Sequence, residues 1–350
     1  MRDQAFAWLQ QQEDASTKTF TVSDVDEFDC NLPGQVVWRE VEGTFQSPLF
    51  LTAAPGPIGA VQHNVDANDT PVQNGTYPAS FTISVPCVVL DAGGPTSHPL
   101  VIGHGLFGTG ESLVRGTPQS LADRLADAGI AADWVYIAGG TDWRGLSSQD
   151  LLWVGSQIIG FGSSRLNNFP AFPDRLRQGV SDTLVLGRMM KRGLFNMDPA
   201  FQTPGGEGIF PGQSEEMFYY GISLGGIYGL MFAATSPDIE RAYIDVGAIN
   251  FSMLLQRASP FAVFDSLLAG IGLTDPMQAA MGIGLVHELW VSAESAGYAT
   301  HITSDPLPGT NAKKILMANA WLDKQVSNQC SEIAARTLGL SALEGSVWKG

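Results

Sequence analysis

The sequence predicts an α/β fold: a doubly wound, mostly parallel sheet with a helical cap insertion and a β-rich N-terminal region. From Pro99 onward, short apolar segments alternate with helical patterns, which is typical of a parallel sheet covered by helices on both faces. At one junction stands Gly221-Ile222-Ser223-Leu224-Gly225, a G-x-S-x-G pattern typical of a sharp strand-to-helix turn. Before Pro99, β-branched and aromatic segments separated by turn residues indicate strands joined by loops.

The composition is that of a large globular protein. Of its 350 residues, 44% are hydrophobic and 15% are charged, enough apolar mass for one large domain with insertions or for two domains. The formal net charge is −16 and the pI is about 4.5. An acidic surface argues against nucleic acid and anionic membranes, so we expect no nucleic-acid partner.

The three cysteines leave two interpretations open. Either Cys30 and Cys87 form a disulfide while Cys330 is free, or all three are small buried hydrophobic residues. The first ten residues contain no apolar h-region, so no signal peptide is expected in this chain. No uninterrupted apolar run reaches membrane length, which predicts no integral membrane segment.

Residues 1–97 are predicted as the β-rich N-terminal region. Strands are expected at 36–41 and 80–85, on either side of a polar loop at 54–76. No His, Asp or Glu cluster in the chain has metal-ligand spacing, so no metal site is expected.

The α/β core is predicted in two parts, 98–249 and 313–350, separated by a helical cap at 250–312. The cap is unusually apolar, and a connection of this length is usually functional. A shorter insertion at 145–173 carries four large aromatic residues: Trp153, Phe161, Phe169 and Phe172.

Within the core, strands are predicted at 100–102, 134–138, 217–220, 241–246 and 314–319. Helices are predicted at 117–128, 178–192, 226–234 and 328–338. In the first of these helices, Leu121, Leu125 and Ala128 are expected to form the packing face.

The strand at 217–220 and the helix at 226–234 flank Ser223, which is the context that a nucleophile elbow needs. Such a turn forces the serine into a strained backbone conformation and lifts its hydroxyl clear of the sheet. Gly221 and Gly225 are expected to leave room for strand and helix to pack closely around it. Ser223 is therefore predicted to be a nucleophile.

A second glycine-rich turn supplies the groups that would stabilise an oxyanion. The strand that ends at Ile102 runs into His104, Gly105 and Leu106. The backbone N–H groups of Leu106 and Leu224 are predicted to be the two oxyanion donors. His104 is expected to brace the turn.

These motifs resemble the α/β-hydrolase superfamily, in particular bacterial serine esterases and lipases. The resemblance rests on His104-Gly105-Leu106-Phe107-Gly108, on Gly221 to Gly226 and on Ala318 to Asp323, and it spans roughly residues 98–340. It implies ester hydrolysis through an acyl-enzyme, with no cofactor. The β-rich region resembles that of large exported bacterial hydrolases, which implies a secreted or periplasmic full-length protein.

The resemblance also implies a catalytic acid after the strand that follows the cap. Asp323 lies just past the strand at 314–319, so it is the predicted acid. Asp245, at the end of the preceding strand, is the alternative.

The histidine departs from the family pattern. The order should be Ser, Asp, His, but no histidine follows Asp323. His301 is the internal substitute, whereas His287 is expected to be packed in an apolar cap helix. A catalytic histidine beyond Gly350, in a longer protein, is the explanation we expect.

The sequence is therefore compatible with two functions. The first is a carboxylesterase or lipase acting on small or polymeric esters with apolar acyl or aromatic groups. The second is a non-catalytic hydrolase-like module that binds an apolar ligand or a partner.

Overall fold

A computed structural model describes residues 1–91, 97–129, 134–159, 168–212, 216–261 and 274–343. Phe161 of the predicted aromatic insertion and residues 262–273 of the predicted cap lie outside the described residues. Among the described helices, none is both long and apolar enough to cross a bilayer.

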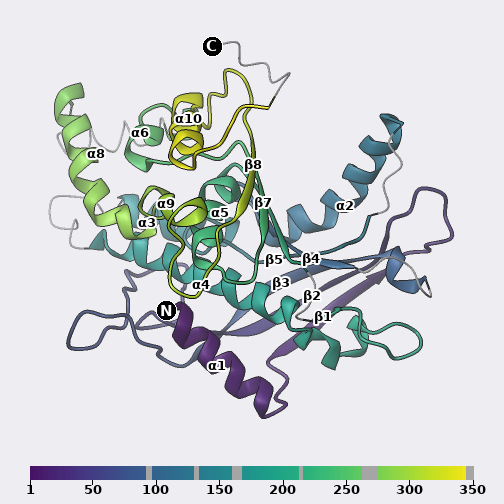
Figure 1. Cartoon of the computed structure of the whole chain (residues 1–350). Helices are drawn as coiled ribbons and strands as arrows, with labels where there is room; N and C mark the ends of the chain where they lie inside the picture. The colour runs from purple at the N-terminus through teal and green to yellow at the C-terminus, as the bar shows by residue number, and fades with distance from the viewer. Residues whose placement is uncertain (92–96, 130–133, 160–167, 213–215, 262–273, 344–350) are drawn as a thin grey trace.

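One eight-stranded sheet runs through the molecule in the order β1-β2-β3-β5-β4-β6-β7-β8 (Figure 1). Its strands are β1 (Phe20–Glu27), β2 (Val37–Pro48), β3 (Thr76–Pro86), β4 (His98–Gly103), β5 (Tyr136–Gly140), β6 (Phe218–Ile222), β7 (Arg241–Asp245) and β8 (Lys314–Ala318). In this sheet order, each neighbouring pair from β5 to β8 is parallel. The pairs β1–β2, β2–β3 and β3–β5 are antiparallel. The mixed sheet confirms the predicted α/β class, and the N-terminal strands extend the same sheet.

The described helices are α1 (Arg2–Asp14), α2 (Gly110–Asp127), α3 (Leu151–Ile159), α4 (Ala171–Lys191), α5 (Leu224–Thr235), α6 (Phe251–Leu255), α8 (Pro276–Trp290), α9 (Thr300–Thr303) and α10 (Asn328–Thr337). Helices α4 and α5 are almost entirely buried against one face of the sheet, and α2 contacts the other (Figure 1). Helix α1 was not predicted. Its buried Ala5 and Leu9 are too few to give a Gln-rich segment a clear helical pattern.

Helices α4 and α2 both begin seven residues before their predicted starts. In α4, Pro173 stands in the first helical turn, where a proline removes no intrahelical hydrogen bond. In α2, the predicted packing face is wrong: the buried residues are Gly110, Val114 and Pro118. The second half of α2 leaves the sheet (Figure 1), so its apolar residues do not reach the core.

A buried carboxylate fixes α4 to the antiparallel part of the sheet. Asp182 accepts hydrogen bonds from the Ser47 hydroxyl of β2 at 2.6 Å and from the Tyr77 hydroxyl of β3. The Gln178 amide donates to it at 2.8 Å within α4. Burial raises the pKa of Asp182, and these hydrogen bonds oppose that rise. The network anchors the longest described helix to β2 and β3.

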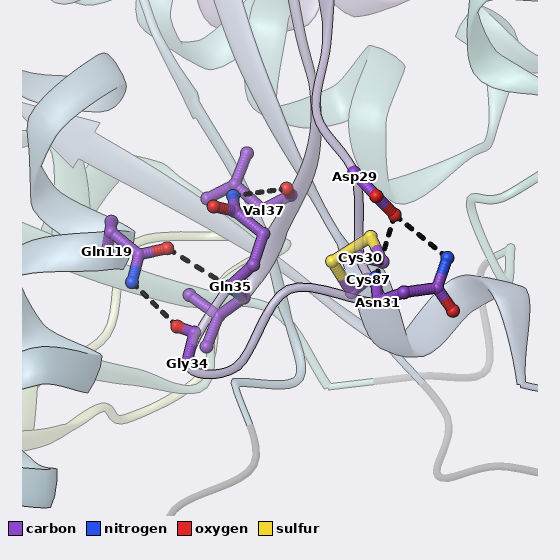
Figure 2. The surroundings of a disulfide bond; sticks show 9 residues. Asp29, Cys30, Asn31, Gly34, Gln35, Val37, Cys87 and Gln119 are labelled. Atoms are coloured by element: carbon purple, nitrogen blue, oxygen red, sulfur yellow. Dashed lines mark hydrogen bonds between the residues drawn. A yellow bond between two sulfur atoms is a disulfide. The ribbon is translucent and has the colours of Figure 1, made fainter.

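Cys30 and Cys87 form a disulfide, which decides between the two interpretations of the cysteines (Figure 2). Cys87 directly follows β3, and Cys30 lies in the loop between β1 and β2. The same loop is held to α2, because Gln119 donates to the Gly34 carbonyl at 2.8 Å and accepts from the Val36 N–H at 3.1 Å. Cys330 is free and buried on α10.

We expect the Cys30→Ser/Cys87→Ser double variant to lose about 4 kcal/mol of unfolding free energy, the chain-entropy value for a loop of this length. The bond spans a sequence separation of 57, so it restricts a large part of the unfolded chain. Urea unfolding of both proteins, with and without reductant, measures the difference. Reductant should destabilise the wild type and leave the double variant unchanged; equal unfolding midpoints for the two proteins without reductant would contradict the prediction.

Candidate active site

Ser223 occupies the predicted strained turn between β6 and α5. Its backbone has φ 55° and ψ −115°, a region that residues other than glycine rarely occupy. Its N–H donates to the Asp245 carbonyl of β7 at 3.0 Å, and its carbonyl accepts from the Ile227 N–H at 2.9 Å. The strand, the turn and the helix therefore form the nucleophile elbow that the motif predicts.

Close backbone contacts around the elbow require glycine. A Cβ on Gly221 would lie 2.3 Å from the Gly225 carbonyl oxygen, and one on Gly225 would lie 2.0 Å from the Gly103 carbonyl oxygen. The buried Tyr219 hydroxyl donates to the Gly225 carbonyl at 2.6 Å. Sequence analysis missed this bond, although Tyr219 stands two residues before Gly221.

The loop after β4 lies against the serine. A Cβ built on Gly105 would lie 3.7 Å from the Ser223 Cβ and 4.0 Å from its Oγ. The loop is held in place by Phe107, which has a positive φ of 55° and whose N–H donates to the Leu146 carbonyl at 2.9 Å.

Each of the two predicted oxyanion donors belongs to the residue that directly follows one partner of this contact. Leu106 directly follows Gly105, and Leu224 is the first residue of α5, where N–H groups have no intrahelical acceptor. Among the described residues, neither N–H donates a hydrogen bond to a protein group.

His104 fixes the shape of this loop. Its Nε2 accepts the Trp143 N–H at 2.8 Å, so the ring proton is on Nδ1, which donates to the Gly105 carbonyl at 2.7 Å. Burial lowers the pKa of His104 and favours the neutral ring. Because both nitrogens are engaged, His104 cannot take the proton of Ser223.

Asp142 also supports the loop. Its carboxylate accepts the Gly110 N–H at 3.0 Å and the Ser80 hydroxyl at 3.2 Å. It therefore joins the start of α2 to β3.

The two candidate acids occupy different environments. Asp323 follows β8, and its Oδ1 accepts the N–H groups of Gln325 at 2.7 Å and Val326 at 3.0 Å. The Asp245 carboxyl alternates with the buried Ile244 along β7, so it lies on the face of the sheet away from α5. Burial raises the pKa of Asp245. Neither carboxylate is hydrogen-bonded to a histidine.

The structure does not bring His301 to Ser223. His301 lies in α9, where the Lys313 N–H donates to the Ile302 carbonyl at the amino end of β8. The following loop meets the far end of α5, because Arg2 donates to the carbonyls of both Thr235 and Pro308. Ser223 stands at the other end of α5, about 18 Å away at the helical rise of 1.5 Å per residue. Chain order alone did not show whether α9 packs at the amino or the carboxyl ends of the parallel strands.

The other histidines have local partners. The His63 ring pairs with Asp174 at 2.9 Å, and His287 Nε2 lies 3.9 Å from a Glu294 carboxylate oxygen. His98 is the first residue of β4, at the opposite end of that strand from the glycine loop. No hydrogen bond joins any of the five histidines to Ser223 Oγ in the described part of the chain. The same residues hold no group of three or more His, Cys, Asp and Glu side chains placed to bind a metal.

The sheet has five parallel strands, with a crossover at β4 and β5 and an elbow at the carboxyl end of β6. The fold is that of an α/β-hydrolase. No family model matches the sequence, and no curated protein matches it.

Similar solved structures include two esterases and a peptidase. The acetyl xylan esterase from Paenibacillus sp. R4 is 14% identical, with 97% of this chain and 94% of that chain covered and a TM-score of 0.46. Acetyl xylan esterase 1 from Thermoanaerobacterium sp. JW/SL YS485 is 11% identical, with 96% and 94% covered and a TM-score of 0.43. The Pyrococcus horikoshii acylaminoacyl peptidase is 12% identical, with 92% and 43% covered and a TM-score of 0.45.

The lowered pKa of His104 predicts a loss of stability in mild acid. The neutral ring stabilises the fold fully above its ordinary pKa of 6.5, and that contribution is lost as the pH falls through the lower folded-state value. The slope is at most about 1.4 kcal/mol per pH unit. In urea unfolding between about pH 7.5 and about pH 5, we expect His104→Gln to decline less steeply than the wild type. Identical slopes in the wild type and His104→Gln would refute the assignment.

Proposed function

We propose that this chain is a serine hydrolase of carboxylic esters that acts through an acyl-enzyme. The observation that carries the proposal is the strained, positive-φ backbone of Ser223 at the elbow, with the Gly105 turn beside its hydroxyl. The unused N–H groups of Leu106 and Leu224 support it further. A strained serine with two unused backbone donors in the adjacent residues and loop is suited to attack on a carbonyl.

In the proposed reaction, Ser223 Oγ forms a bond to the ester carbonyl carbon and gives its proton to a base. The carbonyl oxygen becomes negative and accepts hydrogen bonds from the Leu106 and Leu224 N–H groups. Collapse breaks the bond to the alcohol, which leaves with a proton, and water then releases the acid from Ser223 by the same steps. Each oxyanion donor of this kind contributes about 10²–10³ in rate.

The proposed substrate class is an uncharged ester with an apolar acyl or aromatic group, either small or polymeric. Aromatic side chains of the two insertions support it, because Trp290 stacks on Phe172 and packs against Phe251 with centroids 6.0 Å and 4.9 Å apart. The Cys30–Cys87 disulfide supports the proposed secreted or periplasmic location, since such bonds persist in oxidising compartments.

A second candidate is a non-catalytic module that binds an apolar ligand. It is favoured by one observation: none of the histidines is hydrogen-bonded to Ser223 Oγ or to Asp323. Reaction with a fluorophosphonate separates the candidates, because it requires a nucleophilic serine.

We expect a fluorophosphonate probe to label Ser223, and Ser223→Ala to lose all labelling and all ester hydrolysis. His301→Ala should label at the wild-type rate to within about twofold, because α9 lies at the amino ends of the parallel strands and Ser223 lies at their carboxyl ends. Mass spectrometry of the labelled peptide identifies the site. Absence of labelling in the complete folded protein would favour the binding module, and a large loss in His301→Ala would contradict the placement of α9.

Asp323→Asn tests the acid while preserving the local turn, since an asparagine oxygen can accept the same two backbone N–H groups. We expect a loss of about 10³–10⁴ in kcat for ester hydrolysis if Asp323 orients the base. The matched variant Asp245→Asn should stay within about threefold of the wild type, because that carboxyl faces away from α5. The reverse pattern would assign the acid to Asp245.

A further inference from the structure

A group of buried polar side chains lies between the cap and the nucleophile helix. Tyr228 belongs to α5, His287 and Trp290 to the last turns of α8, and Glu294 follows four residues after α8. We call these four residues the Glu294 cluster. None of them has a role in the proposed acyl transfer.

Only one of the two carboxylate oxygens of Glu294 has a hydrogen-bond partner of normal geometry. Its side chain is fully buried, and Oε1 accepts the Asn250 N–H at 2.9 Å. Oε2 makes no hydrogen bond of normal geometry with the described residues: His287 Nε2 lies 3.9 Å away, and the Phe251 and Ala296 N–H groups interact with the carboxyl group without reaching that geometry at Oε2. Burial raises the pKa of Glu294. One acceptor of a buried carboxyl group is thus left open, which is costly unless something binds there.

Two more polar atoms beside it are also open. Tyr228 is 1% exposed, and its hydroxyl interacts electrostatically with Glu294. The Trp290 indole N–H lies beside that hydroxyl without reaching hydrogen-bond geometry. Within the described ranges, the Tyr228 hydroxyl, the Trp290 N–H and the His287 Nδ1 are all buried and unpartnered.

The chemistry of these atoms restricts what can bind. Glu294 Oε2 needs a donor, whereas the Trp290 N–H can only donate and needs an acceptor. An ammonium group has no lone pair for Trp290, and an anion would be repelled by Glu294 when that group is ionised. A hydroxyl group donates once and accepts twice, so it satisfies both sides.

The cluster is linked to the helix that begins at the elbow and to a residue that supports the glycine loop. Tyr228 follows Ser223 by five residues, and helical side chains lean toward the N-terminus of their helix, here toward the elbow. Its ring lies 5.9 Å from that of Trp143, the residue whose N–H binds His104. The Ser295 hydroxyl, next to Glu294, donates to the Ile227 carbonyl on α5.

We propose that the Glu294 cluster binds a hydroxyl group of the substrate, and that the ester hydrolysed at Ser223 carries such a group in its acyl or its alcohol part. The inference rests on the proposed function and adds the substrate class. An ester without the hydroxyl leaves buried donors and acceptors unpaired, which costs about 10- to 100-fold in binding.

The test measures binding to Ser223→Ala by titration calorimetry, so that no turnover is needed. Three esters are compared: ethyl butyrate without a hydroxyl, ethyl β-hydroxybutyrate with one in the acyl part, and ethylene glycol monobutyrate with one in the alcohol part. We expect one hydroxy ester to bind at least about tenfold more tightly than ethyl butyrate. The hydroxy ester that binds more tightly shows whether the recognised hydroxyl belongs to the acyl part or to the alcohol part of the substrate.

Tyr228→Phe and Trp290→Phe, each made in Ser223→Ala, should abolish the preference, because each removes one polar group and keeps the ring. Tyr220→Phe, on the other face of the sheet, is the matched control and should retain it; thermal unfolding checks that all variants fold. Equal affinities for the three esters, or a preference that survives both cluster variants, would overturn the proposal and indicate a structural water at the cluster. Failure of the fluorophosphonate to label Ser223 would instead count against the proposed function, since the binding measurement does not depend on it.

Discussion

The close approach of three backbone segments around Ser223 is the constraint on which the candidate site depends. Gly225 packs against the Gly103 carbonyl, and Gly221 packs against Gly225, so the end of β4, the end of β6 and the start of α5 are in direct contact. This contact allows the strained φ of Ser223 to persist, because the surrounding structure determines it on several sides. It also places the loop after β4 next to the serine hydroxyl. The nucleophile and the predicted oxyanion donors are therefore products of one packing arrangement.

The polar groups beneath the site divide into two kinds. His104, Asp142 and Asp182 are satisfied by hydrogen bonds, and each joins segments that are far apart in the sequence. The Glu294 cluster differs, since several of its buried atoms have no partner in the described part of the chain. A satisfied network makes a structure rigid, whereas an unsatisfied one is a place where a ligand can gain affinity.

The sequence predicted what local patterns determine. The elbow, the core strands and their parallel pairing were predicted, because G-x-S-x-G, apolar runs and alternation of elements are encoded within short segments. The start of α4 was predicted seven residues too late, and the packing face of α2 was wrong because that helix leaves the sheet. The position of His301 relative to Ser223 could not be predicted, since spacing along the chain does not say where an element packs. Tyr219 and the Glu294 cluster act through contacts that only the folded chain defines.

The two halves of the sheet differ in how far apart their partners are in the chain. Strands β1 to β3 pair with their sequence neighbours, and the Cys30–Cys87 bond closes that part. Strand β4 pairs with β6 only after residues 104–217 have been brought together, and β7 pairs with β8 across residues 246–313. Contacts of long sequence separation form slowly, because the entropy of closing the loop is lost before the contact stabilises it. The antiparallel part can therefore assemble early during folding, and the contact between Gly103 and Gly225 that shapes the elbow belongs to the late stages.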